Sequence, residues 1–176
     1  KNNYNITSGV ERGESKLMLI ANERTAYIKE IPLNIYWKKD NSNKKSIITP
    51  LLKDFTVNEN KHEIICNDTI VNIDFSHVKQ EILNLEINNS ISNQIANTIL
   101  YPIERNRASK ILNEYNQLLK TLDQSKAVDL MILTSFFDEN NLPQYATSTL
   151  LDIVQLEQDN SVFIELLNKY VTTPRQ

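Results

Sequence analysis

The strongest periodic pattern in this chain lies at residues 103–122, which read IERNRASKILNEYNQLLKTL. Apolar residues recur there three and four positions apart, which is the spacing of one buried face of an α-helix. The residues on this face are Ile111, Leu112, Tyr115, Leu118, Leu119 and Leu122. Pro102 directly precedes the stretch and allows a fresh start there. We therefore predict an amphipathic helix over 103–122.

Three more helices are predicted toward the C-terminus, over 126–137, 143–157 and 161–170. Ser125 and Ser161 are the predicted N-caps of the first and third, and Pro143 suits the first turn of the second. The helix over 126–137 is apolar almost all round, so we expect it to be the most buried.

Shorter helical patterns precede these helices. Val78, Ile82 and Leu85 fall on one helical face, and Ile95 and Ile99 resume it after an interruption at 88–90. The change from strand-like to helical periodicity is therefore predicted near residue 76.

The residues before this change have a strand-like pattern. Four strands are predicted, over 16–21, 26–38, 46–57 and 63–75, with breaks at Pro32, at Pro50 and at a turn after Cys66. β-Branched and aromatic residues dominate these segments. The fold predicted for the 176 residues is therefore α+β. A small antiparallel sheet or β-sandwich over 1–75 is followed by a helical bundle over 76–176.

Composition restricts the classes of function. The chain is asparagine-rich and carries a net charge of −3, without the basic stripe of a nucleic-acid binder, so no nucleic-acid partner is predicted. No apolar run approaches a membrane span, so we expect a soluble protein. The first residue is Lys rather than Met, which favours a processed product or a piece of a longer protein. The localisation is left open.

The residue types of metal and catalytic sites are scarce. Cys66 is the only cysteine, and the two histidines, His62 and His77, do not have the spacing of a shared zinc site. A glycine-rich phosphate loop and a nucleophile elbow are both absent from the sequence. We therefore predict no cofactor, no metal and no enzyme activity.

Four residues are candidates for contact with a protein partner. Arg105 and Arg107 stand at the start of the strongest helix, where positive charge is mildly unfavourable, and Tyr101 lies beside them. Contact with an anion or an acidic partner is one explanation for the two arginines, and compensation by Glu104 is the alternative. Trp37 together with Tyr27 makes a binding surface if the two are exposed.

One family resemblance is present. Residues 8–16, SGVERGESK, precede an apolar strand, and residues 103–108, IERNRA, begin a helix. This arrangement resembles the β-sandwich and helices that follow the von Willebrand factor A domain in many multidomain proteins. The resemblance implies an accessory piece, and no ligand-binding residue of the A domain transfers to this chain.

The leading functional hypothesis from the sequence is a non-catalytic interaction or scaffolding module. One alternative is a secreted or surface accessory or effector protein. A second alternative is an enzyme that uses carboxylates in a cleft between the two parts.

Overall fold

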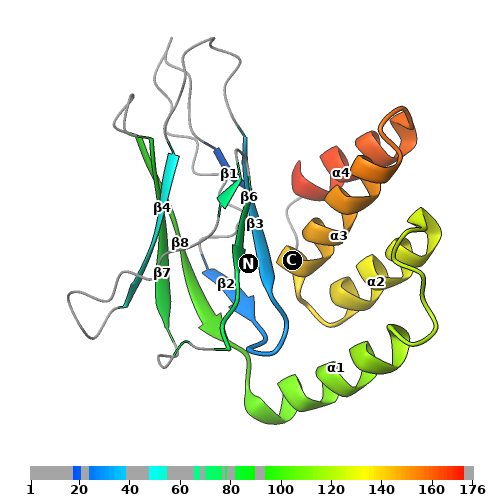
Figure 1. The fold of residues 1–176 in the computed structure, drawn as a ribbon, viewed down its shortest axis with the longest axis horizontal. Helices are drawn as coiled ribbons and strands as arrows, with labels where there is room; N and C mark the ends of the chain where they lie inside the picture. Colours follow the sequence, from blue (N-terminus) through cyan, green and yellow to red (C-terminus); the bar gives the residue numbers. More distant parts are fainter. Residues whose placement is uncertain are drawn as a thin grey trace. The chain divides into compact units, whose positions relative to one another are not determined.

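A computed structural model describes residues 18–20, 24–38, 48–54, 66–67, 70–76, 78, 82–89 and 94–172. The chain divides into two compact units, Lys1–Pro102 and Ile103–Arg175. The described strands belong to the first unit and the described helices to the second (Figure 1). The predicted α+β class is therefore confirmed.

The first unit contains two four-stranded sheets. One has the order β1-β3-β6-β5, with strands Met18–Ile20, Leu33–Lys38, Ile70–Ile73 and Cys66–Asn67. Each neighbouring pair in this sheet is antiparallel. β5 and β6 pair across the turn that the sequence predicts after Cys66.

The second sheet has the order β2-β8-β7-β4, with strands Arg24–Tyr27, Gln94–Pro102, Leu83–Asn89 and Ile48–Asp54. The sequence predicts only antiparallel pairing, but β2 pairs with β8 in parallel. β4 continues through Pro50 as a strand at one end of this sheet order, where a missing backbone N–H is tolerated.

The helices predicted between residues 76 and 99 are wrong, because β7 and β8 lie there. In β7 the side chains of Leu83, Leu85 and Ile87 are buried and alternate with Asn84 and Glu86, which are half-buried. A period of two is the pattern of a strand. Short apolar segments also match a helical spacing, and this ambiguity placed the change of pattern near 76 instead of after Pro102.

Alternate residues of both sheets supply the buried side chains of the first unit. Leu33 and Ile35 of β3 and Val71 and Ile73 of β6 are buried. Two further contacts join segments distant in sequence. The rings of Tyr27 and Phe75 stack with centroids 3.9 Å apart, and the buried hydroxyls of Thr25 and Thr98 lie 3.2 Å apart.

The second unit consists of four helices, α1 (Arg105–Leu118), α2 (Ala127–Glu139), α3 (Pro143–Leu156) and α4 (Ser161–Thr172). All four were predicted, and Pro143 occupies the first turn of α3 as expected. One core cluster of this unit is made by two buried residues of α2, Leu130 and Leu133, and two of α3, Leu150 and Ile153. Apolar side chains of α1, of the connection after it and of α4 pack against these four residues, namely Tyr115, Leu118, Leu119, Leu122, Phe163, Leu166, Leu167 and Tyr170.

The most buried helix is α3, so the prediction that α2 holds this position is wrong. Every side chain from Gln144 to Leu150 is buried, whereas α2 exposes Val128 and Ile132. Small hydroxyl residues make the burial of α3 possible, because their hydroxyls bond within the helix. Thr147 donates to the carbonyl of Pro143 at 2.8 Å, which satisfies a polar group that would otherwise be costly to bury.

The last helix begins with a different cap from the one predicted. The capping side chain is that of Asn160, not Ser161. Its Oδ1 accepts a hydrogen bond at 3.2 Å from the backbone N–H of Val162 in the first turn. Asn and Ser are comparable N-caps, so the sequence alone did not separate the two neighbours.

Candidate functional site

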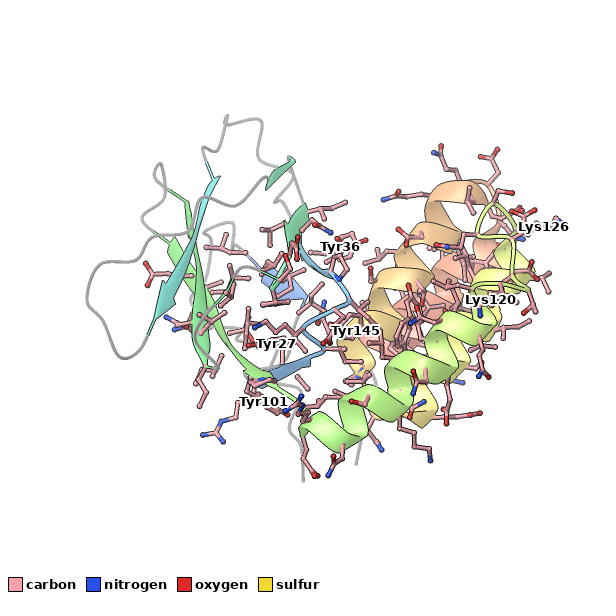
Figure 2. The ribbon with its side chains drawn as sticks, turned by 60° about the horizontal axis from the view of Figure 1, so that its bottom comes forward. Tyr27, Tyr36, Tyr101, Lys120, Lys126 and Tyr145 are labelled. Atoms are coloured by element: carbon pink, nitrogen blue, oxygen red, sulfur yellow. The ribbon has the colours of Figure 1, made fainter. Side chains whose placement is uncertain are left out.

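The four predicted contact residues fall in both units. Tyr101 lies in β8 of the first unit and is 38% exposed. Figure 2 labels it at the end of that strand. The backbone of Trp37 lies in β3, and its side chain is outside the described part of the chain. Arg105 and Arg107 lie in the first turn of α1 and are exposed.

Arg107 has a partner within the helical unit. Its guanidinium donates to the backbone carbonyl of Asn140, the C-cap residue of α2. A helix C-terminus carries partial negative charge and unpaired carbonyls, so a cation is favourable there. This contact gives Arg107 a structural role that joins α1 to the end of α2, and its predicted contact with a partner stays a prediction.

The end of α2 that receives Arg107 is a Schellman motif. Asn141 adopts φ of 53°, the backbone N–H of Leu142 donates to the carbonyl of Phe137, and that of Asn141 donates to Asp138. The side chains of Leu142 and Phe137, the two positions between which this motif commonly has an apolar contact, are both buried. The geometry fixes the direction in which the chain enters α3.

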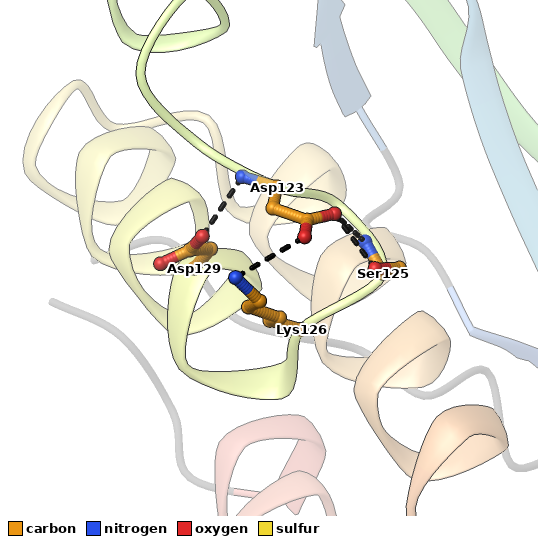
Figure 3. Close-up of polar contacts among 4 residues, drawn as sticks. All are labelled: Asp123, Ser125, Lys126 and Asp129. Atoms are coloured by element: carbon orange, nitrogen blue, oxygen red, sulfur yellow. Dashed lines mark hydrogen bonds and ion pairs between the residues drawn. The ribbon is translucent and has the colours of Figure 1, made fainter.

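The turn between α1 and α2 holds a compact polar network (Figure 3). The carboxylate of Asp123 accepts hydrogen bonds from the hydroxyl and the backbone N–H of Ser125, at 2.7 and 3.1 Å. It also pairs with Lys126 at 3.3 Å. The carboxylate of Asp129 accepts from the backbone N–H of Asp123 at 2.8 Å. The connection is therefore held to the first turn of α2.

This network explains why Ser125 is not the cap that the sequence predicts. The N-cap position of α2 is Lys126, without a side-chain capping bond, and the hydroxyl of Ser125 is bonded to Asp123 instead. The hydrogen bonds from the side chain and then the backbone of Ser125, with a smaller contribution from Lys126, lower the pKa of Asp123. Asp123 is therefore fully charged at neutral pH.

A hollow of about 530 Å³ lies next to this network and opens to solvent. Gln124 of the same turn lines it, together with Asp152, Gln155 and Leu156 of α3 and Gln158 of the turn after α3. The buried side chain of Leu130 also contributes to its wall. The lining therefore combines one carboxylate, three amide side chains and two leucines.

Large apolar side chains are also exposed on the helical unit. Val128 and Ile132, which are 71% and 43% exposed, stand one turn apart on α2. Leu156 is 49% exposed at the end of α3, and Val162 and Ile164 are exposed on α4. Among the described residues of the first unit, the corresponding exposed residues are Ile82 and Tyr101.

The hollow is not predicted from the sequence. No role is predicted from the sequence for Gln124, Leu156 or Gln158. One feature of the sequence points to this region, because no lysine or arginine occurs between Lys126 and Lys169. A pattern of charge along the sequence does not show which residues surround a depression.

The potential metal ligands remain apart in the described part of the chain. No group of three or more His, Cys, Asp or Glu side chains with the geometry of a metal site occurs among those residues. His62 and His77 lie outside the described residues, as does the side chain of Cys66. No helix within the described ranges is long and apolar enough to cross a membrane.

No protein-family model matches this chain, and searches of curated proteins and of solved structures find no match either. The resemblance to the region after the von Willebrand factor A domain therefore stays a prediction from the sequence. Its N-terminal part, residues 8–16, lies outside the described residues.

Proposed function

We propose that this chain is a non-catalytic protein-interaction or scaffolding module whose helical unit carries the partner contact. The observation that supports this proposal is the exposure of Val128 and Ile132 on α2, a helix that otherwise packs its apolar side chains in the core. Adjacent exposed apolar residues on a well-packed helix favour contact with another protein.

The core of the helical unit does not need these two side chains. Leu130 and Leu133 face α3, and α1 contacts the rings of Phe136 and Phe137 through Tyr115. The exposed side of α2 is therefore free to take a role that does not compete with folding. Burying both side chains against a partner contributes on the order of 2–3 kcal/mol.

We also infer that the two sheets of the first unit pack face to face as a β-sandwich. The alternation of buried and less buried residues along β6 and β7 supports this, because each sheet then has one apolar face to cover. In this proposal the sandwich is the rigid support of the module. The family resemblance implies that the module is an accessory part of a multidomain protein.

Affinity capture from cells that express the protein tests the proposed function. Wild-type protein is compared with a Val128→Ser, Ile132→Ser double variant, and the captured proteins are quantified by mass spectrometry. We expect the wild type to retain one protein and the variant to retain at least about ten-fold less of it. A ten-fold loss corresponds to roughly 1.4 kcal/mol of binding free energy.

The control is an Asn113→Ser variant, which changes an exposed polar residue of α1. It should capture the partner as the wild type does. If the wild type and the double variant retain the same proteins in the same amounts, the proposed contact surface is wrong.

A further inference from the structure

The hollow at the end of the helical unit has a defined chemical character. It lies between the α1–α2 turn, through Gln124, and the α3–α4 turn, through Gln158. We propose that it binds a basic, amphipathic segment of the protein partner, an inference that rests on the proposed function. Three observations carry it, namely the charge around the hollow, the acceptors in its lining and the leucines in its wall.

The surroundings of the hollow are acidic. The helical unit, Ile103–Arg175, contains ten acidic and seven basic residues, so it carries the chain's net charge of −3. Glu157 and Asp159 are exposed on either side of Gln158. Charge of one sign around a depression favours a ligand of the opposite sign.

Two lysines lie at this end of the unit, fewer than the acidic residues there, Asp123, Asp152, Glu157 and Asp159. Lys126 is paired with Asp123 at 3.3 Å. Lys120 is exposed at the α1–α2 connection, where Figure 2 labels it with Lys126. Between Lys126 and Lys169 the chain has seven acidic residues and no basic one. The sequence that builds α2, α3 and their turns is therefore selectively acidic.

The lining of the hollow matches a lysine or arginine side chain. The carboxylate of Asp152 and the amide oxygens of Gln124, Gln155 and Gln158 are acceptors for an ammonium or guanidinium group. Leu156 and Leu130 provide apolar surface for the methylene stem of such a side chain, or for an apolar neighbour in the same segment. Nucleic acid and anionic lipid carry the same sign of charge as this surface, so they are disfavoured.

Peptide binding to the full chain tests this inference. The probe is a fluorescein-labelled peptide with leucine at helical i, i+3, i+4 and i+7 spacing and lysine at the other positions. The two comparison peptides replace each lysine with glutamate or each leucine with serine. Fluorescence anisotropy should show saturable binding of the lysine–leucine peptide, weaker binding of the serine peptide and the weakest binding of the glutamate peptide. Added salt should weaken the binding further.

Substitutions at Gln158 locate the site. Gln158 is exposed in a turn, so its replacement leaves the core intact. Gln158→Lys should weaken the lysine–leucine peptide about five-fold, and Gln158→Glu should tighten it about two-fold. Asn106→Lys is the matched control, because it adds the same charge at an exposed position nearly the length of α1 from the α1–α2 turn. It should change the affinity less than two-fold.

The outcomes distinguish failure of the basic-segment inference from failure of the proposed interaction function. Absence of binding, equal binding of the lysine and glutamate peptides, or equal effects of Gln158→Lys and Asn106→Lys would overturn the inference. If that happens while partner capture still depends on Val128 and Ile132, the interaction function stands and only the basic segment is wrong. If partner capture also fails, both proposals are wrong.

Discussion

Alanine substitutions on the two sides of α2 should differ strongly in their cost to stability. Leu130 is 4% exposed and belongs to the buried cluster of the helical unit, whereas Val128 is 71% exposed two positions earlier. Leu130→Ala removes buried methyl and methylene groups and leaves a cavity between α2 and α3. Substitutions of this kind cost about 2.7–5 kcal/mol.

For Val128→Ala, the loss of buried apolar surface and the gain in helix propensity nearly cancel in the free energy of unfolding. About three-tenths of the side chain is covered, so removing its two methyl groups forfeits on the order of 0.5 kcal/mol at about 0.8 kcal/mol per fully buried group. Alanine has the higher helix propensity and returns up to about 0.7 kcal/mol. We therefore expect Val128→Ala to change the free energy of unfolding by less than about 0.5 kcal/mol.

Urea unfolding of the full chain, followed by circular dichroism at the helix band, measures both variants. The two substitutions share one helix, so a general disturbance of α2 would affect them alike. A cost above about 1.5 kcal/mol for Val128→Ala would show that this side chain is covered in the folded protein. A cost below about 1 kcal/mol for Leu130→Ala would refute the packing assigned to the core.

Three further predictions concern the turns and the boundary between the units. Because Asn141 has positive φ, Asn141→Gly should stabilise by about 0.5 kcal/mol and Asn141→Ala should cost about 1 kcal/mol, as thermal unfolding will show. The lowered pKa of Asp123 contributes stability above about pH 4 that is lost as pH falls through the depressed value. The melting temperature of the wild type should therefore exceed that of Asp123→Asn near neutral pH, and the difference should shrink in acid. A fragment of residues 103–176 should unfold cooperatively, whereas 76–176 should aggregate because it carries β7 and β8 without their sheet partners.

The helical unit was largely predictable because its patterns are long. α3 and α4 begin where the sequence places them, since Pro143 and the Asn160–Ser161 pair are strong local markers. The strands β7 and β8 were not predictable in the same way. Their apolar residues fit both periods over short stretches, and pairing with β4 and β2, distant in sequence, decides between them.

The sequence also did not predict which side chains of each helix are buried. Thr147 and Thr149 look polar, yet they are buried because their hydroxyls bond to carbonyls of the preceding turn. Val128 and Ile132 look like core residues, yet they face outward. Which side of an apolar helix is covered depends on its neighbours, and periodicity within the helix does not contain that information. The same reason hid the hollow beside Asp152.

Site-specific photo-cross-linking in cells tests the central claim, that the helical unit binds a protein partner, most directly. A benzophenone amino acid placed at Val128 is compared with the same group at Asn113, an exposed position on α1. We expect a discrete cross-linked product with one protein from Val128 and none from Asn113. Identical products from both positions, or no product from Val128, would contradict it.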